Sequence, residues 1–146
     1  MNPEFHAQEI PPFPQIPAGT NVVAIGIDLE SVGRVRKAIE RHETAFLEKV
    51  FTAEETELCK NRGNAQWASF AARWAAKEAF SKALGTGIGA KFAMTDAGVI
   101  NDEHGAPAFT LSARAQTALR ERGASRALLS LSHTNDTAAA IVVFLA

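Results

Sequence analysis

An alanine-rich segment near the middle of the chain limits the possible folds more than any other feature. The stretch "FAARWAAKEAFSKALGTGIG", residues 70–89, begins with strong helix formers and ends in three glycines spaced two apart. At roughly 100° per residue, one side of this helix collects Ala72, Ala75, Ala76, Ala79 and Ala83. Because small side chains let a backbone approach its neighbour closely, the pattern predicts a long helix, ending near residue 84, that packs tightly into the fold.

The other side of this helix is polar and allows two interpretations. It carries Arg73, Trp74, Lys77, Glu78, Ser81 and Lys82. One interpretation is a solvated face, with Glu78 and Lys82 as an i, i+4 pair worth about 0.3 kcal/mol. A functional face is favoured by Trp74 and by the following glycines, which would let a phosphate approach backbone N–H groups. The glycine spacing matches neither a Walker loop nor a dinucleotide-binding fingerprint, so it also fits a plain helix end.

Composition indicates one globular domain. The chain has 146 residues, of which 47% are hydrophobic and 21% charged, and its net charge is -1. This balance excludes a strongly basic nucleic-acid binder, and the longest apolar run, "TAAAIVVFLA", is too short for a membrane helix. The single cysteine, Cys59, and the lack of a signal-like segment near the start predict a cytoplasmic protein.

Periodicity divides the chain into a proline-rich arm and one folded domain. Residues 1–20 hold five of the six prolines and show no helical or strand period, so we expect a flexible or extended arm. Residues 21–146 form the domain. Its predicted elements are a strand at 21–28, helices at 31–41, 51–63, 64–84 and 112–123, a hairpin at 97–112, and two strands between 126 and 146. Adjacent hairpins with helices against them indicate an α+β fold with an antiparallel or mixed sheet.

Three helix starts carry capping signals. Thr52 and Glu55 stand in capping-box register, and Ser112 directly precedes the last predicted helix. Asn64 is the candidate cap of the long alanine-rich helix. These residues predict where the three helices begin.

Asp28, which closes the first predicted strand, has two possible roles. Asp28 or Ser31 could cap the helix that follows. Alternatively, Asp28 could bind a divalent metal ion together with Glu78, since Mg²⁺ is commonly held by one or two carboxylates and by substrate phosphates. The sequence contains no His/Cys cluster with zinc spacing.

The first predicted helix has an apolar and a basic face. Val32, Val35 and Ile39 recur at helical spacing on the inner face. The basic stripe consists of Arg34, Lys37 and Arg41. It is either a solvated face, with Glu30 placed i, i+4 to Arg34, or a surface that attracts an acidic partner.

Three segments, in this order, carry a resemblance to a known family. They are "GIDLESVGR" at 26–34, "WAAKEAFSKALGTGIG" at 74–89 and "SLSHTNDTAAAIVV" at 130–143. Together they closely resemble the holo-[acyl-carrier-protein] synthase family, the small type of 4′-phosphopantetheinyl transferase, from about residue 22 to the end. The resemblance implies the fold of that family. It also implies transfer of the phosphopantetheine arm of coenzyme A to a serine of an apo acyl carrier protein, which releases adenosine 3′,5′-bisphosphate and serves fatty acid biosynthesis.

The same resemblance implies roles for individual residues. Asp28 and Glu78 would bind Mg²⁺ at the pyrophosphate, and Lys82 would contact the phosphates, so these three residues would be catalytic. The coenzyme A site would be lined by Lys82, Gly85, Gly87, Ser132, His133 and Thr134. The acidic carrier protein would dock on Arg34, Lys37 and Arg41. Members of this size form homotrimers with active sites at subunit interfaces.

The expected chemistry agrees with these residue types. Displacement at phosphorus needs neutralisation of developing charge and alignment of the attacking hydroxyl. The serine also needs a base, for which Glu78, directly or through a metal-bound water, is the nearest candidate. Lys77 either binds phosphate or anchors the helix. Trp74 stands where the family more usually has phenylalanine.

Two other functions compete with the enzyme. A non-catalytic module that binds coenzyme A or a carrier protein would keep the glycines and the basic helix but would not need both Asp28 and Glu78. A structural protein would use the charged helix only as an assembly surface.

Overall fold

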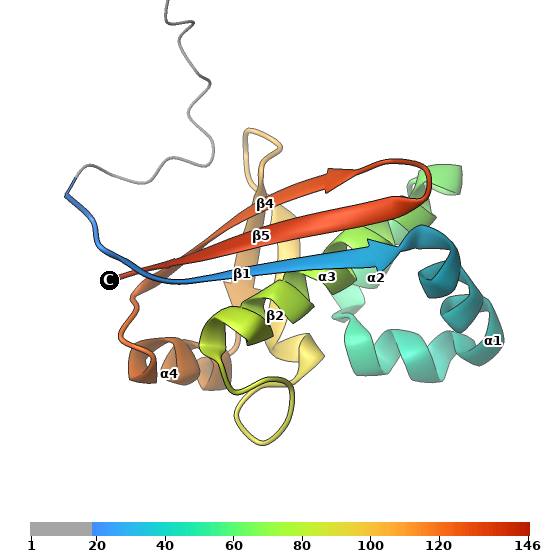
Figure 1. Ribbon diagram of the computed structural model, residues 1–146. Coiled ribbons are helices and arrows are strands. Elements are labelled where there is room, and N and C mark those ends of the chain that lie inside the picture. The colour runs from blue at the N-terminus through green and yellow to red at the C-terminus, as the bar shows by residue number, and fades with distance from the viewer. Residues whose placement is uncertain (1–18) are drawn as a thin grey trace, which may run out of the picture.

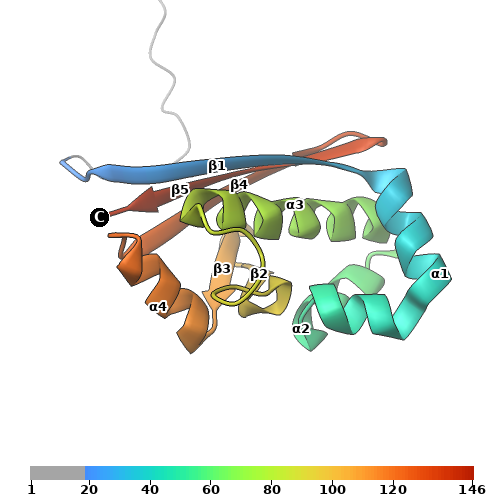
Figure 2. The ribbon, with the colours of Figure 1, turned by 60° about the horizontal axis from the view of Figure 1, so that its bottom comes forward.

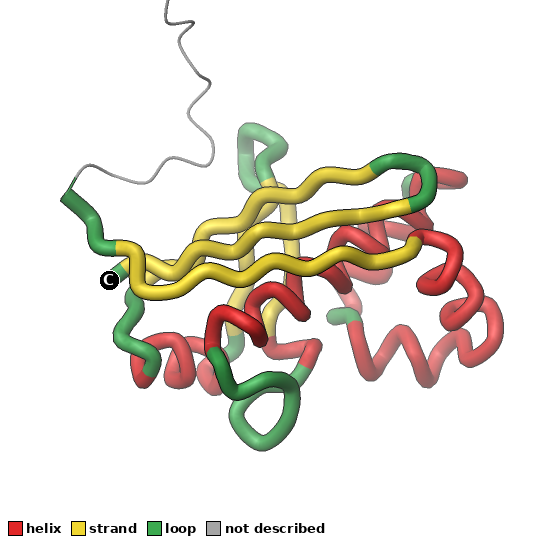
Figure 3. Tube along the Cα trace, in the orientation of Figure 1, coloured by secondary structure: helices red, strands yellow, loops and turns green. Residues whose placement is uncertain are grey.

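The computed structural model describes residues 19–146, which form helices packed against two antiparallel sheets (Figures 1 and 3). The predicted arm at 1–20 lies outside the described residues, apart from its last two. The main elements are β1 (Val22–Ser31), α1 (Val32–Val50), α2 (Ala53–Lys60), α3 (Gln66–Leu84), β2 (Ala97–Asn101), β3 (Pro107–Leu111), α4 (Ala113–Glu121), β4 (Arg126–His133) and β5 (Thr137–Leu145). Two short 3-10 helices, η1 (Gly63–Ala65) and η2 (Met94–Asp96), complete the list. The predicted α+β class is confirmed.

The larger sheet has three antiparallel strands in the order β1-β5-β4, and β2 and β3 form a separate hairpin. One face of the larger sheet is buried and contributes Ala138, Ala140, Val142 and Phe144 from β5. The other face carries large apolar side chains that are exposed. They are Ile25 (67% exposed), Ile27 (58%), Leu29 (65%) and Ile141 (42%). In Figure 2, no helix of the described chain covers this face.

Helix α3 lies directly beneath the buried face of the sheet and forms the centre of the molecule (Figure 2). Its closest approach is to β1, at Gly26. A Cβ atom added at Gly26 would lie 1.9 Å from the carbonyl oxygen of Ala79, so only glycine fits here. The predicted alanine side, including Ala75, Ala76 and Ala79, is fully buried. The close packing predicted from the alanines is confirmed.

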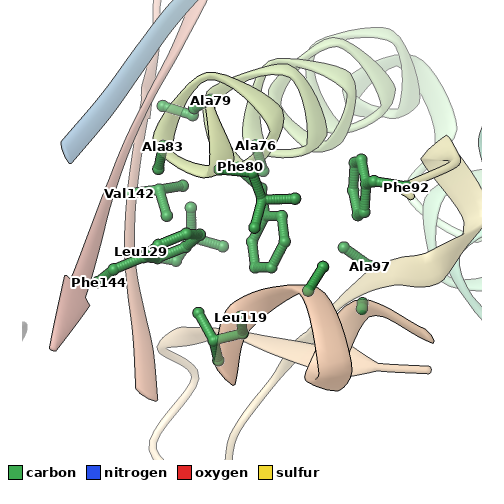
Figure 4. Close-up of a cluster of buried hydrophobic side chains, with 14 of the residues drawn as sticks. Ala76, Ala79, Phe80, Ala83, Phe92, Ala97, Leu119, Leu129, Val142 and Phe144 are labelled. Carbon is green, nitrogen blue, oxygen red and sulfur yellow. The ribbon is translucent and has the colours of Figure 1, made fainter. Parts of the chain in front are cut away.

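The hydrophobic core is divided into two clusters along α3. The first surrounds Phe80, whose ring lies about 5 Å from those of Phe92, Phe109 and Phe144. Figure 4 shows alanines of α3 facing Val142 and Phe144 of β5, with Leu119 of α4 nearby. The second cluster joins α1 and α2 to the first half of α3, where the ring centroids of Phe51 and Phe70 lie 4.9 Å apart.

The polar side of α3 is not a continuous surface. Arg73, Lys77 and Ser81 are buried, because the β2-β3 hairpin and α2 cover this side of the helix. Lys77 Nζ donates to Glu55 Oε1 (2.6 Å) and to the carbonyls of Met94 (3.0 Å) and Ala97 (2.7 Å). Lys77 therefore anchors the helix. The prediction that these three residues lie on an accessible polar face was wrong.

The predicted caps are confirmed, with one exception. Thr52 and Glu55 form the capping box of α2, and Ser112 accepts a hydrogen bond from the backbone N–H of Ala115 in α4. Asn64 lies in η1 and does not cap α3, whose first turn has no side-chain cap. The short 3-10 turn leads the chain directly into the long helix.

Helix α1 is longer than predicted and is kinked. It continues beyond Arg41 to Val50, with a break at Glu43, where φ is 33° and ψ is -110°. Ser31 caps its start by accepting a hydrogen bond from Arg34 N–H, so the capping role falls to Ser31 and not to Asp28. None of the helices in the described part of the chain has the length and hydropathy needed to cross a membrane.

Candidate active site

Asp28 and Lys82 meet where β1 crosses α3. Alternation along β1 turns Asp28 toward the helix, on the same face as Gly26. Lys82 Nζ donates to Asp28 Oδ1 (2.8 Å) and to the carbonyl of Ile27 (3.0 Å). The hydrogen bond to Asp28 raises the pKa of Lys82, so the ammonium group stays charged. Two of its three N–H donors are engaged, and its side chain is half exposed.

Glu78 lies one turn before Lys82 on the same helix and is partly buried. Its carboxylate accepts a hydrogen bond from the indole Nε1–H of Trp74, at 3.4 Å. The Trp74 ring in turn packs against Phe46 of α1, with ring centroids 5.1 Å apart. The Trp74 ring therefore forms an apolar wall beside the charged groups.

Glu30 is a third carboxylate at the same place, where it was not predicted. Burial, followed by interaction with Asp28 and with Glu78, raises its pKa to about 7. No ion pair joins Glu30 to Arg34 in residues 19–146, since Glu30 belongs to the strand and not to the helix. The sequence does contain a signal for Glu30. Residues two apart in a strand lie on the same face, so Glu30 shares the face of Asp28.

The excess of negative charge fits a divalent cation. Three carboxylates, Asp28, Glu30 and Glu78, interact here with one ammonium group, Lys82. The Oδ2 atom of Asp28 is buried and has no hydrogen-bond partner among the described residues. A buried carboxylate oxygen without a partner is costly, and hard cations such as Mg²⁺ bind this type of oxygen. Within residues 19–146, no group of three or more Asp, Glu, His or Cys side chains is placed to hold a metal ion, so a site here would rest on two carboxylates.

The glycine segment follows directly on this cluster. Gly85 ends α3 in a left-handed conformation with φ of 78°, and Gly87 also has a positive φ of 69°. No heavy atom lies within 4 Å of the position that a Cβ would take at either residue. A side chain would therefore meet no neighbour at these two positions, and the N–H of Gly85 donates to the carbonyls of Ser81 and Lys82.

Ser132, His133 and Thr134 lie at the end of the larger sheet that is remote from the glycine segment. The register places Asp28 opposite Ala140, and Ala140 opposite Leu131, so the exposed end of β4 lies beyond Asp28 in the direction of α1. Helix α3 runs the other way along β1, so its last residues lie beside Gly26 and the glycine segment follows them there. Within one chain, the structure thus brings together Asp28, Glu78 and Lys82 but not the two predicted parts of the coenzyme A site.

The predicted docking residues share one exposed surface of α1. Arg34, Lys37 and Arg41, with Ala38 and His42, line a shallow hollow of about 260 Å³. A larger cavity of about 720 Å³ between the end of α1 and α2 contains none of the predicted site residues. The candidate site is therefore the cluster of Asp28, Glu78 and Lys82, where charged groups interact with one another.

Known proteins give an independent view of the chain. Residues 24–142 match the model of the 4′-phosphopantetheinyl transferase superfamily. The chain is 41% identical over 119 residues to a holo-[acyl-carrier-protein] synthase of Ruminiclostridium cellulolyticum, which covers 82% of this chain and 89% of the relative. It is 43% identical over 122 residues to the synthase of Chlamydia caviae, covering 83% and 95%.

Solved structures agree with these sequence matches. The holo-[acyl-carrier-protein] synthase from Neisseria meningitidis superimposes with a TM-score of 0.78 at 35% identity, covering 85% of this chain and 98% of that one. The synthase from Helicobacter pylori, solved in complex with coenzyme A, gives a TM-score of 0.72 at 33% identity, covering 84% and 99%. The chain therefore belongs to the holo-[acyl-carrier-protein] synthase family of 4′-phosphopantetheinyl transferases.

Proposed function

We propose that the protein transfers the 4′-phosphopantetheine arm of coenzyme A to a serine of an apo acyl carrier protein. The observation that carries this proposal is the cluster of Asp28, Glu78 and Lys82 beside an open glycine backbone, in a chain of this family. The serine Oγ attacks the pantetheine-side phosphorus, the bond from this phosphorus to the bridging oxygen breaks, and adenosine 3′,5′-bisphosphate leaves.

The chain's own residues align and neutralise the reacting groups. Lys82, with one N–H donor not engaged by Asp28 or Ile27, stabilises negative charge on the phosphate oxygens. The proton of the attacking serine hydroxyl passes to Glu78, directly or through a water molecule. The open backbone around Gly87 would let the pyrophosphate approach the main chain closely, whereas the N–H of Gly85 already donates to the carbonyls of Ser81 and Lys82.

Asp28 and Glu78 are the residues that would hold Mg²⁺, which supplies positive charge to the pyrophosphate oxygens when it is bound. The unpartnered Oδ2 atom of Asp28 supports this assignment. Lys82 would keep its contact with Oδ1 and leave the other oxygen for the ion.

The test of this function is a mass measurement. Incubation with coenzyme A, Mg²⁺ and an apo acyl carrier protein should add the mass of one phosphopantetheine arm to the carrier, and EDTA should prevent the gain. Several apo carriers, from fatty acid and from other pathways, should be compared in parallel. No mass gain on any carrier, with coenzyme A bound, would favour a non-catalytic binding module.

Substitution of the two acidic residues tests the site itself. Asp28→Ala and Glu78→Ala should each abolish transfer while the circular dichroism spectrum and melting temperature stay close to wild type. Glu48→Ala, at an exposed position of α1 remote from the cluster, is the control. Near-normal turnover in both site variants would show that the metal pair is assigned incorrectly.

We also propose a homotrimer with its active sites at subunit interfaces, located in the cytoplasm. The exposed apolar face of β1 and β5, with Ile25, Ile27 and Leu29, supports an interface. So does the separation of Ser132–Thr134 from the glycine segment, since a second subunit would supply the part of the coenzyme A site that one chain leaves remote. The cytoplasmic location is supported by Cys59, which is free and buried.

The carrier protein would dock on α1. Arg34, Lys37 and Arg41 are exposed on one surface of this helix. Basic side chains of this kind attract an acidic partner and raise its association rate. A reversal of charge at these positions should therefore raise the KM for the carrier and leave the affinity for coenzyme A unchanged.

A further inference from the structure

Trp74 contacts the proposed metal ligand Glu78 through its one polar atom. In residues 19–146, the indole Nε1–H of Trp74 is the only hydrogen-bond donor to the Glu78 carboxylate. The two residues are four apart on α3, so they lie on the same side of the helix. The distance of 3.4 Å is longer than the usual upper limit of about 3.2 Å for an N–H···O bond, and catalytic hydrogen bonds are often long before substrate binds.

The indole ring is held in place from a second element. Phe46, which follows the kink in α1, packs on Trp74 with ring centroids 5.1 Å apart and an interplanar angle of 32°. Phe46 also forms an edge contact with Phe51, at 6.3 Å. Both Phe46 and Trp74 are half-buried against the core cluster of α1, α2 and α3. The direction of the N–H bond is therefore set by packing and not by Glu78 itself.

An indole N–H can only donate a hydrogen bond, which limits what it does to a carboxylate. It restricts the rotamers of Glu78. Because the bond is made to Oε1, the second carboxylate oxygen remains available to a cation. Removal of a group that hydrogen-bonds to a metal ligand and orients it typically lowers metal affinity or activity about 10- to 100-fold.

We propose that Trp74 is a positioning residue, whose indole N–H holds the Glu78 carboxylate in the orientation that binds Mg²⁺. This role rests on the proposed function, because it requires Glu78 to be a metal ligand. The apolar wall formed by the ring is a separate property, which a phenylalanine would keep while losing the donor.

Metal binding without turnover is the direct test. Mn²⁺ is titrated into wild type and Trp74→Phe in the presence of coenzyme A and without any carrier protein, and bound ion is followed by electron paramagnetic resonance. The Kd for Mn²⁺ should rise about tenfold in Trp74→Phe. Trp67→Phe, which changes the other tryptophan of the chain, should remain within about twofold of wild type. A Kd for Trp74→Phe within about twofold of wild type overturns the proposal.

Fluorescence provides a second measurement, in a variant that retains the indole of Trp74. In Trp67→Phe, Trp74 is the only tryptophan, and its emission should change as Mg²⁺ saturates the site in the presence of coenzyme A. In Trp74→Phe, the emission of Trp67 should stay constant, since Trp67 contacts Arg36 and not Glu78. A constant emission of Trp74 through the titration contradicts the proposal, even if Trp74→Phe itself fails to fold.

Asp28→Ala separates this inference from the function on which it rests. Loss of Mn²⁺ binding in Asp28→Ala, together with the weaker binding of Trp74→Phe, supports both. Binding that survives Asp28→Ala overturns the metal pair and the role of Trp74 with it. Loss in Asp28→Ala with unchanged binding in Trp74→Phe overturns only the role of Trp74.

Discussion

Glu43 is the one non-glycine residue between 19 and 146 with a positive φ, and it lies in the middle of α1. Its φ of 33° and ψ of -110° fall in a region that glycine adopts and that other L-residues avoid. Strained backbone of this kind costs about 1 to 3 kcal/mol. The strain exists because α1 must bend here to bring Phe46 and Leu47 against the core.

Glu43→Gly should therefore stabilise the protein. We expect the free energy of unfolding to increase by about 1 kcal/mol, after subtraction of the extra chain entropy that glycine brings to the unfolded state. Urea denaturation followed by circular dichroism measures it. The matched control is Glu48→Gly, at an exposed helical position of the same element, which should lose about 1 kcal/mol. A loss of stability in both variants would show that Glu43 is not strained.

The role of a site residue could be predicted where it depends on neighbouring residues in the sequence. It could not be predicted where it depends on contacts with distant parts of the chain. The position of Asp28 at the end of an apolar strand, and of Glu78 and Lys82 one turn apart, can be read from the sequence. The burial of Lys77 cannot, because it depends on Glu55 and on two carbonyls far away in the chain. A helical wheel assigns Lys77 to a polar face whether that face meets water or another element.

The contact between β1 and α3 depends on the absence of a side chain at Gly26. Gly26→Ala should lower the free energy of unfolding by about 3 kcal/mol or more, since the new Cβ would lie 1.9 Å from the carbonyl oxygen of Ala79. Differential scanning calorimetry should show the loss. Gly33→Ala is the control: its Cβ would have 3.9 Å of space, and it should gain up to about 1 kcal/mol of helix stability. Wild-type stability in Gly26→Ala would contradict this packing.

The buried ion pair of Lys77 and Glu55 fastens α3 to α2 and to β2. Burial lowers the pKa of Lys77, and the Glu55 carboxylate opposes this shift. Lys77→Met should cost about 3 to 5 kcal/mol, because it leaves the Glu55 charge buried without its partner. Lys91→Met removes the exposed pair with Glu121 and should cost less than about 1 kcal/mol. Equal losses in the two variants, measured by urea denaturation, would mean that burial of the pair is unimportant.

Helix and strand boundaries followed from the sequence best where a cap marks them. Thr52 with Glu55 and Ser112 each cap the predicted helix, because capping depends on residues within one turn. The end of α1 was missed. The helical period of its apolar residues is interrupted at Glu43, and the pattern alone gives no indication that the helix resumes after a kink.

The outer face of the larger sheet is apolar and is exposed in the single chain. The outer side of β1 pairs Ile25 with Val143 and Ile27 with Ile141 of β5, which makes a continuous apolar surface. Ile27→Glu would place a charge at its centre, and a charge buried in an interface without a partner is costly. Because Ile27 is 58% exposed in the single chain, its replacement should leave the fold of each subunit intact.

Ile27→Glu should therefore convert the proposed trimer into folded monomers and lose most of the transfer activity, because each active site would lack the part that the neighbouring subunit supplies. Sedimentation velocity measures the assembly, and the carrier mass shift measures the activity on the same samples. Thr110→Glu, at an exposed strand position on the β2-β3 hairpin, should leave both unchanged. Full activity in a monomeric Ile27→Glu would show that one chain holds a complete site, and a wild-type monomer would exclude the trimer itself.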